Sequence, residues 1–229
     1  SCSNLERAII PDSVKSIGEY AFYGCKNITQ LQLSSSLTEI SASTFESCEG
    51  LTEVVIPDSV IEVYPGAFSY CKNLSSITIP SSVQSISHGA FVGTMWYNNQ
   101  PDGYMYINNI LYDYKGKVPE NTEIVIKEGT TEIGAYAFEK QRNVTGVKIP
   151  ASVSIIGAGA FRYCDNLKSV RVEDSVKFLG MYAFSQGITM YGRSGSAAQE
   201  YSKTPRFEVT FILIGDVDKD GDVSITDAT

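Results

Sequence analysis

The stretch AIIPDSVKSIGEYAFYGCKNI, residues 8–28, decides the fold, because close copies of it recur along the chain. The same pattern returns as VVIPDSVIEVYPGAFSYCKNL at 54–74 and as VKIPASVSIIGAGAFRYCDNL at 147–167. Self-similarity at a fixed period of about 20–50 residues is typical of repeat architectures. The copies therefore predict a solenoid, in which neighbouring rungs bury a core that no single rung could bury.

Two columns of apolar residues set the period of the repeats at 23 residues. One column consists of phenylalanines, which are Phe22, Phe45, Phe68, Phe91, Phe138, Phe161 and Phe184. The other marks the end of an expected strand and contains Ile10, Leu33, Ile56, Ile79, Ile126, Ile149 and Val172. Both columns contain one step of 47 residues, which predicts a degenerate, irregular rung across 92–138.

Each rung is expected to have three sides. The alternation in LTEVVIP, residues 51–57, predicts a short strand with one buried face, and the proline ends it. A second apolar pair follows, such as Val60 and Val63. The motif A-F-x-x-C then has the spacing of one helical turn, with Phe and Cys pointing inward.

All five cysteines fall in one column of the repeats: Cys2, Cys25, Cys48, Cys71 and Cys164. Residues of one column stack in a line, whereas a metal needs ligands that converge on it. The odd count also argues against a complete set of disulfides. We therefore expect free, buried thiols that pack as small hydrophobic side chains.

The regular period ends after residue 192, and residues 193–214 are expected to cap the solenoid. The segment 188–214 predicts a last strand, a short helix with Ser194 or Ser196 as its N-cap, and another strand. Inside the irregular rung, YMYI and ILYDY flank Asn108 and Asn109. A two-residue asparagine turn of this kind predicts a β-hairpin.

The irregular rung is also the aromatic-rich part of the chain, with the single Trp. Exposed aromatic side chains are frequent binding hot spots. Trp96, Tyr97, Tyr104 and Tyr106 are therefore a possible ligand platform. The alternative is structural: the same rings cover the core where the regular columns are missing.

Composition excludes several classes of function. The 229 residues carry a net charge of −8, and half of this excess lies in residues 215–229, which contain five Asp and one Lys. No basic surface for nucleic acid is expected, and no apolar run is long enough to span a membrane. No catalytic motif occurs, and the single histidine, His88, lies in a column of varied residues. We expect no enzymatic activity.

The last stretch, GDVDKDGDVSITDAT at 215–229, has different chemistry. Oxygen-bearing side chains occupy the ligand positions of a twelve-residue calcium loop, with Gly221 sixth: Asp216, Asp218, Asp220, Asp222, Ser224 and Asp227. This pattern predicts a calcium loop. The alternative is an acidic tail that binds no ion.

Residues 1–190 resemble the BspA-like leucine-rich repeats, through the pattern IPxSVxxIGxxAFxxCxNL. The resemblance implies a leucine-rich-repeat horseshoe that is mainly β, with a continuous parallel sheet on one face and short helical turns opposite. It further implies a secreted or surface protein of a bacterium that acts in adhesion or protein–protein interaction.

The terminal loop resembles the first half of a type I dockerin, a family that also has Asp at the twelfth loop position. A complete dockerin holds calcium in two such loops and binds a cohesin of a scaffoldin. Loop positions ten and eleven, here Ile225 and Thr226, help to choose the cohesin in that family. The sequence stops at Thr229, before the helix and the second loop, so calcium is expected in the complete dockerin.

Together the two resemblances imply a secreted, non-catalytic component of a cell-surface cellulosome. Its solenoid would present a binding face to an unknown protein or polysaccharide. Two alternatives remain open. One is a host- or surface-directed adhesin, and the other is a non-catalytic part of a larger polysaccharide-degrading enzyme.

Overall fold

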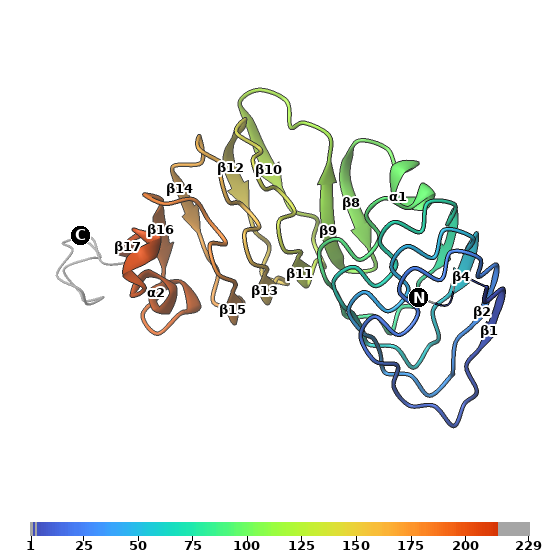
Figure 1. Ribbon diagram of the computed structural model, residues 1–229. Helices are drawn as coiled ribbons and strands as arrows, with labels where there is room; N and C mark the ends of the chain where they lie inside the picture. Colours follow the sequence, from blue (N-terminus) through green and yellow to red (C-terminus); the bar gives the residue numbers. More distant parts are fainter. Residues whose placement is uncertain (1, 3, 215–229) are drawn as a thin grey trace, which may run out of the picture. The chain divides into compact units, whose positions relative to one another are not determined.

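The computed structural model describes residue 2 and residues 4–214, and it is a mainly β solenoid built from parallel strands. The chain forms two compact units, residues 1–101 (unit 1) and residues 102–229 (unit 2), as Figure 1 shows in blue to green and in green to red. Every sheet lies within one unit. The predicted fold class is confirmed.

The L-x-x-Φ-x-Φ-P segments form the first strand of each rung, with the middle residue turned inward. In unit 1 these strands are β1 (Arg7–Ile9), β2 (Gln30–Gln32), β4 (Glu53–Val55) and β6 (Ser76–Thr78). In unit 2 they are β10 (Thr122–Val125), β12 (Val144–Lys148), β14 (Ser169–Arg171) and β16 (Thr189–Gly192). They pair in parallel as β1–β2, β4–β6, β10–β12 and β14–β16. Since most have only three residues and few hydrogen bonds, this side is divided into small sheets instead of one continuous sheet.

The second apolar pair of each repeat forms a further ladder of mostly two-residue strands. In unit 1 it comprises β3 (Glu39–Ile40), β5 (Glu62–Val63) and β7 (Ser85–Ile86). In unit 2 it comprises β9 (Ile110–Lys115), β11 (Glu132–Ile133), β13 (Ile155–Ile156) and β15 (Phe178–Leu179). The inward residues of this ladder, such as Ile40 and Val63, are buried and close the second side of the core.

The third side differs from the expected helical turn, because it is a run of tight turns. In the rung of Phe45, the N–H groups of Phe45 and Ser47 donate to Ala67 and Ser69 of the next rung, at 2.9 and 2.8 Å. The N–H of Cys48 instead turns back to the carbonyl of Phe45, at 3.2 Å. Positive φ angles at Ser43 and Ser47, 52° and 60°, prevent a continuous helix.

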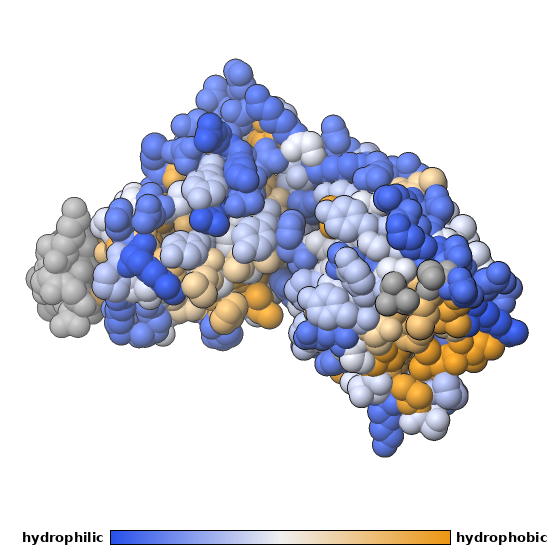
Figure 2. Space-filling model, in the orientation of Figure 1, coloured by the Kyte–Doolittle hydropathy of each residue, from blue (hydrophilic) through white to orange (hydrophobic). Residues whose placement is uncertain are grey.

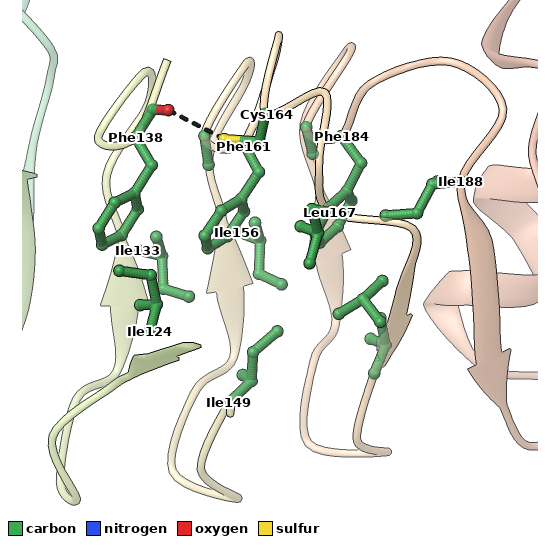
Figure 3. Packing of buried hydrophobic residues seen from close by; sticks show 14 of the residues in the cluster. Ile124, Ile133, Phe138, Ile149, Ile156, Phe161, Cys164, Leu167, Phe184 and Ile188 are labelled. Carbon is green, nitrogen blue, oxygen red and sulfur yellow. Dashed lines mark hydrogen bonds between the residues drawn. The ribbon is translucent and has the colours of Figure 1, made fainter. Parts of the chain in front are cut away.

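Phenylalanine rings stack along the axis of each unit. Phe22, Phe45, Phe68 and Phe91 lie 5.2–6.1 Å apart in unit 1, and their ring planes differ by 11–14°. In unit 2 the ring centres of Phe138, Phe161 and Phe184 are 5.1–5.2 Å apart. Figure 3 shows this stack. Offset ring stacking adds to the free energy of area burial. The predicted phenylalanine column is therefore the centre of the core.

The irregular rung contains the predicted hairpin. Strand β8 (Gly103–Ile107) pairs antiparallel with β9, and Asn108 has a φ of 53° in the connecting turn. Helix α1 (Met95–Asn98) precedes the hairpin in the chain and belongs to unit 1.

The predicted strand, helix and strand after the last rung are also confirmed. They are β16, helix α2 (Ala197–Ser202) and β17 (Thr210–Leu213), and β17 pairs in parallel with β16. The hydroxyl of Ser196 caps α2 by accepting from the N–H of Gln199 at 3.4 Å. A 3-10 turn, η1 (Pro205–Phe207), was not predicted, and its Phe207 stacks on Tyr201 at 4.4 Å.

The first rung is more open than those that follow it. Its core residues Ile10, Val14, Ile17 and Phe22 are only half-buried. Figure 2 shows hydrophobic side chains gathered at the N-terminal end of unit 1. Phe45, one rung further along, is fully buried, because rings lie on both of its faces.

This difference within one stack generates a stability prediction. Replacing Phe45 by Ala should lower the free energy of unfolding by about 3–5 kcal/mol, because it leaves a cavity between two rings. Phe22→Ala is the matched control and should cost clearly less, since Phe22 is only half-buried and, among the described residues, stacks on Phe45 alone. Chemical denaturation measures both, and equal losses would show that the stack does not act as a core.

Candidate ligand-binding face

The calcium and cohesin residues of the terminal loop lie outside the described residues: Asp216, Asp218, Asp220, Asp222, Ser224, Ile225, Thr226 and Asp227. Within residues 2 and 4–214, no group of three or more His, Cys, Asp and Glu side chains could hold a metal ion. The same residues include no helix that is long and apolar enough to cross a membrane. A site in this part of the chain has to be sought on the faces of the repeats.

Trp96 and Tyr97, two residues of the predicted platform, lie in unit 1 on helix α1. The hydroxyl of Thr94 caps this helix by accepting from the N–H of Tyr97 at 3.0 Å. The indole of Trp96 meets Phe91 edge to face, with ring centres 5.2 Å apart. Trp96 therefore covers the end of the phenylalanine stack of unit 1.

Tyr104 and Tyr106, the other two, lie in unit 2 on β8. Their hydroxyls accept from the N–H groups of Val125 and Lys127, at 3.4 and 3.0 Å. The N–H of Val125 ends β10 and that of Lys127 follows two residues later, on the edge of β10 that faces away from β12, its only partner strand in the described chain. The hydroxyls of the two tyrosines thus take the place of the backbone carbonyls that a neighbouring strand would supply in a regular rung.

The platform residues are therefore divided between the two units, two in each. Tyr104 also meets Tyr114 and Phe138, with ring centres 5.2 and 6.2 Å apart. The packing contacts of Trp96, Tyr104 and Tyr106 agree with the structural alternative, in which these rings cover the core of the irregular rung. Ligand binding by these rings stays a prediction.

The cysteine column has a hydrogen-bonding role. The thiols of Cys48, Cys71 and Cys164 donate to the carbonyls of Phe22, Phe45 and Phe138, at 3.1–3.2 Å (Figure 3 shows the last of these). Each of these carbonyls also accepts a backbone N–H of its own rung, so the thiol is a second donor that links two neighbouring rungs. Burial raises the pKa of the Cys164 thiol to about 12.

All five cysteines are free, as predicted. Four are buried, whereas the prediction of burial is wrong for Cys2, which is exposed at the outer end of the column. Polar residues replace Cys in two rungs. Thr94 accepts in the cap of α1, and Gln141 bonds the backbone of Gly116 and Val118.

Two further columns on the turn side hold the backbone in the left-handed region. They stand two residues before and two residues after the buried Phe of each rung. The first contains Tyr20, Ser43, Gly66, Gly89, Tyr136, Gly159 and Tyr182, with φ between 52° and 76°. The second contains Gly24, Ser47, Tyr70, Gly93, Lys140 and Tyr163, with φ between 55° and 76°.

Tyrosine is an unusual residue in these columns, because a left-handed backbone costs a residue with a Cβ about 1–2 kcal/mol relative to glycine. Five tyrosines nevertheless occupy them: Tyr20, Tyr70, Tyr136, Tyr163 and Tyr182. The first four are at least 36% exposed, so burial does not account for their presence. We call this set the turn-face tyrosines.

Two turn-face tyrosines of unit 2, Tyr163 and Tyr182, border a hollow of about 370 Å³. The guanidinium of Arg162 lies between them, 4.6 Å from the ring centre of Tyr163 and 5.3 Å from that of Tyr182. Ser185, Gln186 and Asp165 add a hydroxyl, an amide and a carboxylate to the lining. The hollow therefore combines flat rings with hydrogen-bonding groups, as ligand sites do.

A larger hollow of about 740 Å³ lies beside helix α2, also in unit 2. Its apolar lining includes Phe178 and Met181, which are 58% and 53% exposed. Arg206 lines this hollow and also stacks on Tyr182, with its guanidinium carbon 5.5 Å from the ring centre. Tyr182 and Arg206 thus link the smaller hollow to the larger one.

Sequence reasoning missed the turn-face tyrosines, although the sequence contains a signal for them. In both columns tyrosine alternates with glycine at the same repeat position, as in Gly159 and Tyr182. Glycine in a fixed column indicates a backbone with positive φ. A tyrosine in that column is then a residue whose presence needs an explanation.

Comparison with known families found a match to the model described as "BspA type Leucine rich repeat region". It occurs in six copies that span residues 1–118 and 107–191. A comparison with curated proteins gave no match.

Among solved structures, the chain is similar to a leucine-rich repeat protein from Bacteroides ovatus, with 17% identity over 90% of this chain and 66% of the other, and a TM-score of 0.43. It is also similar to a leucine-rich repeat protein of T. pallidum, with 24% identity over 81% of this chain and 64% of the other, and a TM-score of 0.39. A leucine-rich cell surface protein from Faecalibacterium prausnitzii matches with 22% identity over 98% and 85% of the two chains, and a TM-score of 0.39. The chain thus spans slightly less than two thirds of the length of the first two proteins.

The cysteine geometry predicts the pattern of thiol reactivity. At pH 8 a thiol reagent should modify Cys2 in the native protein and reach the other four cysteines only after denaturation. Burial shields the other four thiols from the reagent, and at Cys164 it also raises the pKa to about 12, so that this thiol stays protonated at pH 8. Cys2→Ser should abolish the native reaction. Rapid modification of the Cys2→Ser protein without denaturant would contradict the buried column.

Proposed function

Because the chain belongs to the BspA-type leucine-rich repeat family, we propose that it is a secreted, non-catalytic interaction module of a cell-surface cellulosome. The repeats present a rigid binding face. A dockerin that begins at residue 215 attaches the protein to a cohesin of a scaffoldin through calcium.

The family assignment supports the coarser part of the proposal. Leucine-rich repeat solenoids of this kind are interaction and surface modules, and the fold is not typically catalytic. Stacked rungs hold the side chains of each column at fixed spacing, so an extended surface keeps its shape without ligand. Such preorganisation lowers the conformational entropy that binding costs.

The observation that carries the tether is the ligand pattern of the terminal loop. Asp216, Asp218 and Asp220 offer side-chain carboxylates at alternate positions, Asp222 offers its carbonyl, and Asp227 closes the set. This all-oxygen donor set suits calcium, whereas no His or Cys is present that would favour zinc or copper. When calcium is bound, its charge offsets the repulsion among the carboxylates.

The roles of the remaining loop residues follow from their positions. Ser224 contributes an oxygen directly or through water, and Gly221 permits the sharp turn in the middle of the loop. Ile225 and Thr226 directly follow the ninth loop position and are the residues we expect to contact the cohesin. An adhesin that acts without a scaffoldin is the competing function.

The tether can be tested by measuring cohesin binding of the full-length protein in calcium and in chelator. Binding should require calcium, and Asp216→Ala should weaken it by about tenfold or more, because a first-position carboxylate ligand is lost. Asp58→Ala is the matched control, since it removes one exposed Asp of a unit 1 turn and should leave binding unchanged. Titration calorimetry against a panel of cohesins provides the measurement.

Two results would argue against the tether. Cohesin binding that persists in chelator would remove the dockerin from the proposal. Failure to bind any cohesin, together with attachment of the protein to cells or matrix, would instead support the adhesin.

A further inference from the structure

Two tyrosines in successive rungs of unit 2 have a backbone conformation that is unfavourable for a residue with a Cβ. Tyr163 has a φ of 60° and Tyr182 a φ of 53°, and in other rungs glycine stands in each of these columns, as at Gly24 and Gly159. Glycine would relieve the strain at either position. Residues held in a strained backbone gather at functional sites, so an observed outlier is a reason to look for a ligand.

The two tyrosines are part of a row in which rings and guanidinium groups alternate. Arg162 stacks on both Tyr163 and Tyr182, and Arg206 stacks on Tyr182 and on Phe207, at 5.5 and 5.3 Å. Cation–π contacts of this kind hold both partners in place. The row therefore presents fixed rings and fixed positive charges beside the hollow of about 370 Å³.

The surroundings of the hollow are cationic, although the whole chain has a net charge of −8. Six charged side chains line the hollow or contact its lining, two carboxylates and four cations: Glu139, Asp165, Lys140, Arg142, Arg162 and Arg206. Glu139 pairs with Lys140 and Arg162, Arg162 and Arg206 both stack on Tyr182, and Arg142 pairs separately with Asp165. Arg206 has no carboxylate within ion-pair distance among the described residues. The local excess of positive charge favours an anionic ligand.

The lining of the larger hollow also contains more cations than carboxylates. Its two carboxylates are already paired, Asp174 with Arg193 at 3.4 Å and Glu200 with Lys203 at 2.5 Å. Lys177, which also lines it, has no carboxylate within ion-pair distance in the described chain and donates to a backbone carbonyl at 2.7 Å. Arg206 and Lys177, which lack a carboxylate partner among the described residues, thus both line the larger hollow, and Arg206 adjoins the smaller one through Tyr182.

We propose that the hollow between Tyr163 and Tyr182 binds a uronic-acid unit of an acidic polysaccharide, whose chain continues past Arg206 into the larger hollow. The inference rests on the proposed function, because it names the ligand class of the binding face. A pyranose ring would place its C–H face on a tyrosine ring and its hydroxyls toward Ser185 and Gln186. Its carboxylate would meet a guanidinium, which binds such groups in bidentate fashion.

An acidic peptide is the competing ligand, and the geometry of the smaller hollow favours the saccharide. Its lining offers the exposed ring of Tyr163, the hydroxyl of Ser185, the amide of Gln186 and charges. The exposed apolar residues Phe178 and Met181 lie in the other hollow. A peptide held in the smaller hollow would find few apolar contacts for its side chains. A sugar ring needs none, since one of its faces stacks and its edge forms hydrogen bonds.

The test is calorimetric titration of the full-length protein with trigalacturonate. The acid should bind, and its methyl ester, which has the same shape but no charge, should bind at least about tenfold more weakly. Tyr163→Gly should lower the affinity by about tenfold, because the stacking ring is lost. The same variant should not lower the melting temperature, because glycine relieves the strained backbone.

Tyr70→Gly is the matched control for Tyr163→Gly. Tyr70 stands in the same column of unit 1, with a φ of 55° and an exposure of 50%, against 60° and 41% at Tyr163. Its replacement should leave trigalacturonate binding unchanged. Arg206→Gln, a variant in the larger hollow, should also weaken binding of the acid by about tenfold and leave the weak binding of the ester unchanged.

Several results would overturn the inference. They are no binding of trigalacturonate, equal binding of acid and ester, or an unchanged affinity in the Tyr163→Gly protein. Stronger binding of a glutamate oligomer than of trigalacturonate would assign the hollow to acidic peptides. Cohesin binding, measured on the same samples, separates the two proposals: a protein that binds cohesin and not the uronate keeps its tether and loses this ligand.

Discussion

The repeats depend on how the backbone N–H groups of the turn side are shared. Those of Phe45 and Ser47 point to the next rung, while that of Cys48 turns back within its own rung. Because of this alternation, a segment too sharply bent for a strand still joins its rung to the neighbour. The phenylalanine rings follow the same spacing, and they stack because the backbone has already aligned them.

The tight bends of the turn side also determine which side chains this side of the solenoid exposes. A chain that bends so tightly has two left-handed residues beside the Phe in every rung but that of Phe184, and most of their side chains are exposed or half-exposed. Glycine meets that need at the lowest cost, so the tyrosines of unit 2 are present in spite of the local backbone. Two of them, Tyr163 and Tyr182, share the guanidinium of Arg162, and Tyr182 also contacts that of Arg206.

The sequence predicts the features that depend on the spacing of residue types. It does not predict the backbone conformation of the turns, which depends on their hydrogen bonds. The period, the phenylalanine core, the free cysteines, the hairpin and the capped helix of Ser196 follow from residue types at fixed intervals. The turns around Phe45 were expected as helix, because the apolar spacing of A-F-x-x-C is the same in both conformations. Only the φ angles at Ser43 and Ser47 distinguish them, and serine is compatible with either. The terminal loop remains a matter of sequence alone, since Asp216 to Asp227 lie outside the described residues.

The hydroxyls of Tyr104 and Tyr106 have a consequence for how the protein folds. In a stacked array a rung is normally stable only when its neighbour has formed, because an unpaired edge leaves backbone N–H groups without acceptors. In unit 2 the acceptors for Val125 and Lys127 come from a hairpin that lies 21 residues earlier in the chain, about one repeat away. The loop that each contact closes is therefore as long as the loop between two ordinary rungs, and its entropic cost is similar. The first edge of β10 is thus satisfied by side chains of the same unit, so its pairing does not depend on a further regular strand.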